Sequence, residues 1–190
     1  MSKNRLEAFS DGVLAIIITI MVLELRPPEG AGLDDLLDLL PTFLSYTLSF
    51  VFVGIYWNNH HHLFQVVSRV DGRVLWANLH LLFWLSLVPF ATAWMGEHGF
   101  TSGPVALYGL VLLLAGLAYF LLVRALLARH GRESVLARAI GSDRKGLLSL
   151  VLYTTAIAAA PGRPLWACAI YVLVAVIWLI PDRRIERHLG

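Results

Sequence analysis

The stretch LEAFSDGVLAIIITIMVLEL, residues 6–25, decides the class of fold. From Val13 to Leu23 every residue except Thr19 is apolar. A helix needs about 20 mostly apolar residues to cross the roughly 30 Å hydrocarbon core of a lipid bilayer. We therefore predict that residues 6–25 form a membrane-spanning helix.

The composition of the whole chain is typical of a membrane protein. Of the 190 residues, 58% are hydrophobic and 15% are charged, and the mean hydropathy is +0.71. These values exclude a disordered chain and differ from those of ordinary soluble domains. The formal net charge of +2 is too small to indicate a polyanionic partner, so we expect no binding to nucleic acid.

Further apolar stretches follow the first one along the chain. They lie approximately at residues 42–64, 74–95, 104–128, 146–160 and 164–180. The stretch 146–160 is the shortest, and short turns with Pro or Gly separate the stretches without a linker to a second domain. The sequence therefore predicts an all-α bundle of six transmembrane helices that forms a single domain, residues 1–190.

The charges of the connecting loops predict how the bundle lies in the membrane. With six spans, all of the 15 Lys and Arg residues except Arg26 and Arg163 fall on one face, together with both termini. Basic residues accumulate on the cytoplasmic side of membrane proteins. We therefore expect a multi-pass protein of the cell membrane with both termini in the cytoplasm. The first outer loop is acidic and carries Glu29, Asp34, Asp35 and Asp38.

Asp11 is the most unusual residue of the first span. A carboxylate that faces lipid there costs at least a few kcal/mol, so Asp11 must face protein or water. The six-span topology brings further polar and aromatic side chains of the second and third spans to the same depth. These are Trp57, Asn58, Asn59, His60, His61, His62, Trp76, Asn78 and His80.

This polar layer has more than one interpretation. In the first, Asp11 accepts hydrogen bonds and joins three helices; in the second, Asp11 binds a cation or relays protons. A metal site or haem on the run His60 to His62 is poorly supported, because consecutive helical residues point about 100° apart. We expect no metal and no cofactor. Enzyme motifs such as Gly-x-Ser-x-Gly and His-Glu-x-x-His are absent, so we also expect no enzymatic activity.

The first span also has an apolar stripe that points away from Asp11. At 100° per residue, Gly12, Ile16, Ile20 and Leu23 lie within about 40° of one direction, and Thr19 lies at the edge of this stripe. Asp11 points about 140° away from Ile16. Spacing alone favours contact with lipid for such a stripe, and composition does not decide the matter.

A signature in the first span resembles that of a known family. Arg5, followed after three residues by Phe9-Ser10-Asp11-Gly12, matches the RxxxFSDG signature of the endosomal/lysosomal transmembrane potassium channels. The segment YWNNHH at residues 56–61 and the third span, residues 75–96, are similar to that family as well. The chain resembles a prokaryotic single-repeat member of the family.

The resemblance implies a pore. Family members have six helices per repeat, prokaryotic members form homotetramers, and the first helices surround the central pore. The family's constriction begins five residues after the signature Asp, which is Ile16 here, with Ile20 and Leu23 further along and Thr19 as the nearest hydroxyl. The resemblance therefore implies that the stripe faces the pore and not the lipid.

The resemblance also implies a packing network behind the pore. It assigns to packing between the first three helices the residues Arg5, Phe9, Ser10, Asp11, Gly12, Trp57, Asn58, His60, His61, Trp76, Asn78 and His80. The expected function is a potassium-permeable cation channel whose partners are its own copies, potassium and other monovalent cations, and membrane lipid. The alternative is a proton-coupled or proton-conducting transporter that uses Asp11 and the His/Trp layer.

Overall fold

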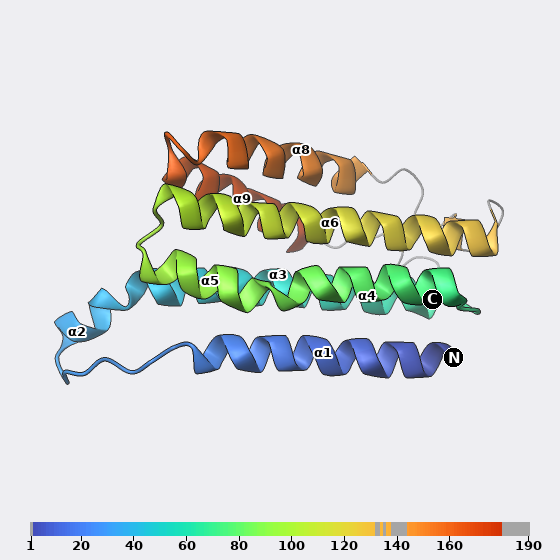
Figure 1. The fold of residues 1–190 in the computed structure, drawn as a ribbon, viewed down its shortest axis with the longest axis horizontal. Coiled ribbons are helices and arrows are strands. Elements are labelled where there is room, and N and C mark those ends of the chain that lie inside the picture. The colour runs from blue at the N-terminus through green and yellow to red at the C-terminus, as the bar shows by residue number, and fades with distance from the viewer. Residues whose placement is uncertain (1, 132–133, 135, 138–143, 180–190) are drawn as a thin grey trace.

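The computed structural model describes residues 2–131, 134, 136–137 and 144–179. Within these ranges all regular elements are helices, which confirms the expected all-α class. Figure 1 shows the long helices running side by side, with α1 along one edge and α8 along the opposite edge. The helices are α1 (Lys3–Leu23), α2 (Leu33–Asp38), α3 (Leu40–Gln65), α4 (Gly72–Ser86), α5 (Val88–Glu97), α6 (Ser102–His130), α8 (Arg144–Ala159) and α9 (Pro164–Leu179).

Four segments are long and apolar enough to cross a membrane. They are Lys3–Leu23, Leu40–Gln65, Gly72–Glu97 and Ser102–His130, and they coincide with the first four expected spans. Helices α8 and α9 have 16 residues each and measure about 24 Å at 1.5 Å per residue, less than the roughly 30 Å hydrocarbon core. The chain is thus a multi-pass membrane protein, and a full crossing by α8 and α9 stays a prediction. The expected end of the sixth span, residue 180, lies outside the described residues.

The third expected span differs from the sequence prediction because it consists of two helices. Helix α4 ends at Ser86 and α5 begins at Val88, with Leu87 between them. Pro89 has no amide hydrogen and cannot donate to the carbonyl of Leu85, as an uninterrupted helix would require. Hydropathy alone does not show this break, because the residues around it are as apolar as those of a continuous span.

The acidic first loop contains a short helix that the sequence analysis treated only as a loop. Helix α2, LDDLLD, begins after Gly32, whose amide donates to Oδ2 of Asp35 at 2.9 Å. Leu33, Leu36 and Leu37 are exposed on it. In Figure 1, α2 lies beyond the end of α1 and is joined to it by an extended segment.

The core of the bundle is centred on α6. This helix packs against α4, α5, α8 and α9, whereas α1 packs against α3, α4 and α5. At Gly109, an added Cβ would overlap the Tyr171 hydroxyl, so only glycine lets α9 approach α6 this closely. The same hydroxyl donates to the carbonyl of Val105 at 3.1 Å. The helices on the α8 side are therefore fixed to α6 and not to α1.

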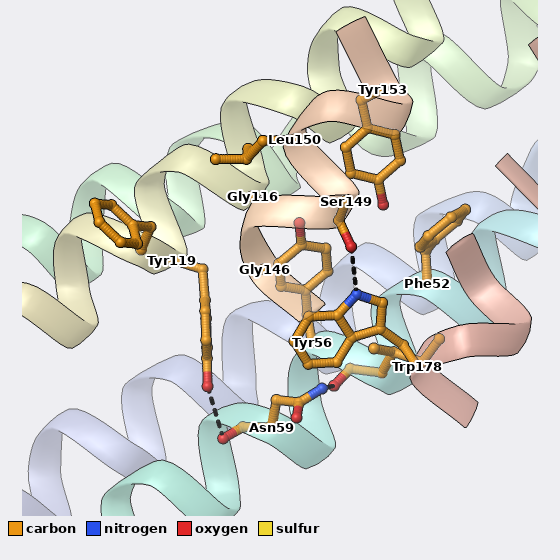
Figure 2. A pocket seen from close by; sticks show the side chains of 12 residues that line it. Phe52, Tyr56, Asn59, Gly116, Tyr119, Gly146, Ser149, Leu150, Tyr153 and Trp178 are labelled. Carbon is orange, nitrogen blue, oxygen red and sulfur yellow. Dashed lines mark hydrogen bonds between the residues drawn. The ribbon is translucent and has the colours of Figure 1, made fainter. Parts of the chain in front are cut away.

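An aromatic groove lies between α3, α6, α8 and α9 (Figure 2). Its cavity volume is about 50 Å³. Two hydrogen bonds cross it: Trp178 Nε1 donates to Ser149 Oγ at 2.8 Å, and the Tyr119 hydroxyl donates to the carbonyl of Asn59 at 3.2 Å. The aromatic residues that line it are Phe52, Tyr56, Tyr119, Phe120, Tyr153 and Trp178.

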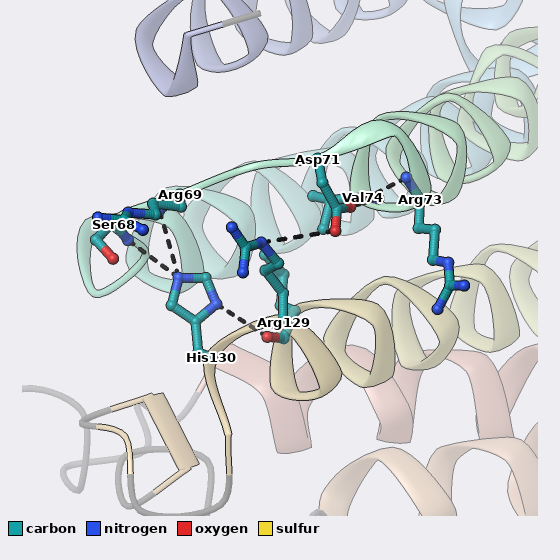
Figure 3. A network of polar contacts seen from close by, with 8 residues as sticks. Ser68, Arg69, Asp71, Arg73, Val74, Arg129 and His130 are labelled. Carbon is teal, nitrogen blue, oxygen red and sulfur yellow. Dashed lines mark hydrogen bonds and ion pairs between the residues drawn. The ribbon is translucent and has the colours of Figure 1, made fainter.

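The loop between α3 and α4 is attached to the last turn of α6 (Figure 3). His130 Nδ1 donates to the carbonyl of Leu126 at 2.9 Å, and its Nε2 accepts from the amides of Ser68 and Arg69 at 3.3 and 3.4 Å. Beside it, Arg129 Nε lies 3.7 Å from Asp71 Oδ2. The imidazole of His130 therefore accepts hydrogen bonds from two amides and holds this loop.

Candidate pore-lining helix and its polar network

One face of α1 packs into the bundle. Its buried residues follow one another at intervals of three or four, which is the spacing of a single helix face. They are Leu6, Ser10, Leu14, Ile17 and Met21. This face contacts α3, α4 and α5, so these three helices set the rotation of α1 about its own axis.

The apolar stripe of α1 lies on a face that the other described residues leave exposed. Ile16, Ile20 and Leu23 are 58%, 42% and 78% exposed, and Thr19 is exposed as well. At Gly12, an added Cβ would meet no atom within 4 Å. Large aliphatic side chains thus remain uncovered along this face, next to a glycine with open space in front of it.

A chain of buried hydrogen bonds joins α1, α4 and α3. Asn78 Nδ2 donates to Ser10 Oγ at 2.9 Å, and the Ser10 hydroxyl donates to the carbonyl of Leu6 at 2.9 Å. On its other side, Asn78 Oδ1 accepts from His60 Nε2 at 2.8 Å. Ser10, His60 and Asn78 are all buried. Because these buried bonds connect side chains of three helices in sequence, they fix the relative depth of the helices.

Asp11 lies at the edge of α1 beside α3. Its Oδ1 accepts a hydrogen bond from Trp57 Nε1 at 3.1 Å. The Trp57 ring stacks on His61, and Gln65 Nε2 donates to His61 Nε2 at 2.9 Å. Asp11 and Trp57 are both exposed within one chain. The carboxylate therefore has a protein partner on α3 and also faces the surroundings of the single chain.

The other members of the expected packing network lie apart from these bonds. Phe9 and Trp76 are exposed, Trp76 by 75%, and Arg5 and Asn58 are exposed too. His80 accepts a hydrogen bond from Trp84 Nε1 at 2.9 Å within its own helix. Within the single chain these side chains are exposed, and their place in the expected packing network stays a prediction.

A second buried polar cluster has no counterpart in the sequence analysis. The hydroxyls of Ser49 and Thr92 lie 2.6 Å apart, and those of Ser49 and Tyr108 lie 3.0 Å apart. They join α3, α5 and α6. The signal for it was the presence of single hydroxyl residues inside apolar spans, since buried hydroxyls in membrane helices need partners on neighbouring helices.

Two further arrangements concern ions. A groove of about 410 Å³ runs between α1 and α5, and Ile20, Glu24, Phe90 and Glu97 are among its lining residues. Its two carboxylates lie at the end of α1 opposite to Asp11.

Among the described residues, no group of three His, Cys, Asp or Glu side chains is arranged to hold a metal ion.

Comparison with known proteins identifies the family. The family model of the endosomal/lysosomal potassium channel TMEM175 matches residues 5–89. A potassium channel of Chryseobacterium sp. (strain P1-3) is 56% identical over 189 residues, which cover 100% of this chain and 98% of that protein. The endosomal/lysosomal proton channel TMEM175 of Gallus gallus is 35% identical over 103 residues, 48% of this chain and 21% of that protein.

A solved structure supports the same conclusion. The lysosomal potassium-selective channel TMEM175 homologue from Chamaesiphon minutus has a TM-score of 0.82 and 28% identity, and the match covers 94% of this chain and 96% of that chain. The relative from Chryseobacterium extends over nearly the full length of both proteins. The chain therefore belongs to the TMEM175 family of endosomal/lysosomal potassium channels.

Proposed function

We propose that this protein is a homotetrameric, potassium-permeable cation channel in which the α1 helices of four subunits surround the pore. The observation that carries the proposal is the division of α1 into two faces. One face is packed against α3, α4 and α5, while Ile16, Ile20 and Leu23 are exposed among the described residues. Relatives named potassium channels, which include a near full-length match, support potassium as the permeant ion.

The stripe has the geometry of a hydrophobic constriction. Residues one turn apart on a helix are separated by about 5.4 Å, so the side chains of Ile16, Ile20 and Leu23 from four subunits form three collars over roughly 10 Å. Collars of this kind open and close by wetting, and ion preference then depends on the cost of dehydration. Thr19 supplies the nearest hydroxyl, which donates to the carbonyl of Ile16 at 2.9 Å.

Gly12 supports close assembly of the four α1 helices. A glycine in a membrane helix lets another backbone approach closely, and the space in front of Gly12 is empty within one chain. Within a tetramer this space is available to a neighbouring α1. The hydrogen bonds from Ser10 and Asp11 to α4 and α3 then hold each α1 in register behind the pore.

Carboxylates at the other end of α1 attract cations. Glu24 and Glu97 line the groove beside Ile20, and Asp34 and Asp38 are exposed on α2. Four copies of these residues around one axis would concentrate cations at this mouth of the pore. With six spans and both termini in the cytoplasm, as the loop charges favour, this mouth faces outwards.

Proton conduction is the second candidate. It is favoured by the Gallus gallus relative, which is named a proton channel, and by the exposed carboxylate of Asp11. In this case Asp11 would exchange protons with the surroundings while its hydrogen bond from Trp57 holds the carboxylate in place.

One experiment separates the two candidates. The purified protein is reconstituted into liposomes that contain either a potassium-sensitive or a pH-sensitive dye, and potassium and proton gradients are imposed in separate runs. A potassium channel produces potassium flux that is independent of Asp11, whereas a proton pathway through Asp11 is lost in Asp11→Asn. Absence of potassium flux from tetrameric protein would contradict the primary proposal.

A further inference from the structure

We propose that the aromatic groove between α3, α6, α8 and α9 holds one acyl chain of an anionic phospholipid, with the lipid phosphate bound at Arg124 and Lys145. The groove lies in the half of the bundle where α3 and α6 end and α8 begins, which we call the basic end. The proposal requires only that the bundle is embedded in a bilayer. Its assignment to the cytoplasmic leaflet rests on the orientation proposed above.

The size of the groove selects a linear chain. Sites for compact small molecules measure about 300–1,000 Å³, whereas the cavity volume of this groove is about 50 Å³. A hydrocarbon chain that enters from the open side needs only the width of one methylene, so it fits where a ring system does not.

The wall of the groove is suited to hydrocarbon. The lining residues include no Asp, Glu, Lys or Arg. Of the polar groups, Ser149 Oγ accepts from Trp178 Nε1, and the carbonyl of Asn59 accepts from the Tyr119 hydroxyl, so both are already used. A charged or strongly polar ligand would find no compensation for its desolvation there.

We place the lipid headgroup at two basic residues next to the groove, Arg124 and Lys145. The guanidinium carbon of Arg124 lies 5.9 Å from the ring centroid of Phe120, which lines the groove. Lys145 precedes the lining residue Gly146, and its carbonyl accepts from Ser149 Oγ at 2.9 Å. The last turns of α6 and the first turn of α8 carry no acid. Basic pockets between membrane helices attract anionic lipid headgroups. We therefore expect an anionic phospholipid to bind here more tightly than a zwitterionic one.

Gly116 offers a direct way to close the groove. An added Cβ there would lie 3.4 Å from Leu150 Cδ2, 3.7 Å from the Tyr56 hydroxyl and 3.9 Å from Tyr153 Cε2. These are ordinary contacts, so Gly116→Ala folds normally and removes a little space. Gly116→Leu extends further into the groove and occupies the position of the chain.

The test is lipid binding by the full-length protein purified in detergent. Dioleoyl phosphatidylglycerol and dioleoyl phosphatidylcholine with brominated chains are titrated separately, and quenching of tryptophan fluorescence reports chains in contact with Trp178. Phosphatidylglycerol binds more tightly than phosphatidylcholine. In Trp178→Phe the part of the quenching that depends on Gly116 is lost, while quenching of the exposed tryptophans such as Trp76 remains. In Gly116→Ala and Gly116→Leu both lipids bind progressively more weakly. Gly103→Leu, the same change near the other end of α6, is the matched control and binds as wild type.

The headgroup contact is tested by removing its charges. Arg124→Gln combined with Lys145→Gln weakens phosphatidylglycerol binding by about 30-fold, since each cation near a membrane surface contributes about 1 kcal/mol, and leaves phosphatidylcholine binding unchanged. Arg69→Gln with Arg73→Gln, at the same end, is the matched control. Equal binding of the two lipids by wild type, or no effect at Gly116, overturns the proposal. Because no ion flux is measured, its failure is distinct from failure of the channel assignment.

Discussion

The indole Nε1 of Trp57 on α3 donates to Oδ1 of Asp11 on α1 at 3.1 Å, across 46 positions of sequence. The bond joins the signature acid of the first span to the second span at the edge of the uncovered face of α1. Asp11 therefore serves as a tether beside this face and does not belong to the stripe of Ile16, from which it is turned by about 140°.

We expect the Asp11 and Trp57 side chains to be energetically coupled. Asp11→Ala and Trp57→Phe each remove the same hydrogen bond, which contributes about 0.5–1.5 kcal/mol, so the double variant is less destabilised than the sum of the two singles. Thermal unfolding of the purified variants measures this coupling. Additive effects would show that the bond contributes nothing. The potassium-to-sodium preference of all three variants stays that of wild type.

Asn78 is predicted to be the most sensitive position of the polar network. Asn78→Leu removes the bond to Ser10, whose hydroxyl still donates to the carbonyl of Leu6, and leaves His60 Nε2 without its partner in a buried site. An unsatisfied buried group costs about 1–3 kcal/mol. The variant loses stability in a thermal melt or yields less tetramer on size-exclusion chromatography. Trp76→Leu, on the same helix but exposed, is the control. An equal loss of thermal stability in both variants would indicate that Trp76 also belongs to the packing network.

The strongest functional prediction concerns Ile16. Ile16→Ala widens the first collar and raises ion flux, and Ile16→Asn keeps the collar wet; both weaken the discrimination between potassium and sodium. Val22→Ala, about 120° around the same helix, leaves permeation unchanged. Flux from reconstituted tetramers or single-channel recording provides the measurement. If Val22 proves as sensitive as Ile16, α1 is not the pore helix.

His130 is expected to control the order of the loop between α3 and α4. His130→Phe removes the acceptor of the Ser68 and Arg69 amides, so hydrogen exchange at these two amides becomes faster. Arg73→Gln, nearby and exposed, is the control. Unchanged exchange in His130→Phe would rule out the imidazole as the anchor.

The orientation of the bundle gives a further prediction. Reporter fusions at the N-terminus and after His188 should label the same side of the membrane, the cytoplasm, because that side carries most of the basic residues. Labelling on opposite sides would mean an odd number of crossings and would remove the six-span topology.

Helical periodicity predicts much of α1, and it does so for a physical reason. The stripe of Gly12, Ile16, Ile20 and Leu23 follows from 100° per residue alone, and these residues do share the uncovered face. The topology of the spans predicts the depth of Asn78 and His60 in the membrane. It does not predict which side chains of the polar layer contact one another, because those contacts depend on the rotation of α3 and α4. His60 is buried, for example, whereas Trp76 is exposed.

Other elements needed information that hydropathy does not carry. Helix α2 has only six residues, too few for a periodic signal. The break before Pro89 is hidden by its apolar neighbours. The Ser49, Thr92 and Tyr108 cluster joins three helices, and its members become recognisable only once α3, α5 and α6 are placed side by side.

The break between α4 and α5 has a mechanical consequence. Helix α4 of this span is anchored through Asn78, whereas α5 packs mainly against α3 and borders the groove beside Ile20. Because Pro89 already lacks the amide that would bond to Leu85, a tilt of α5 relative to α4 costs no helical hydrogen bond at this point. We therefore expect bending of this span to be concentrated at Leu87, while Asn78 keeps α4 in register with α1 and α3.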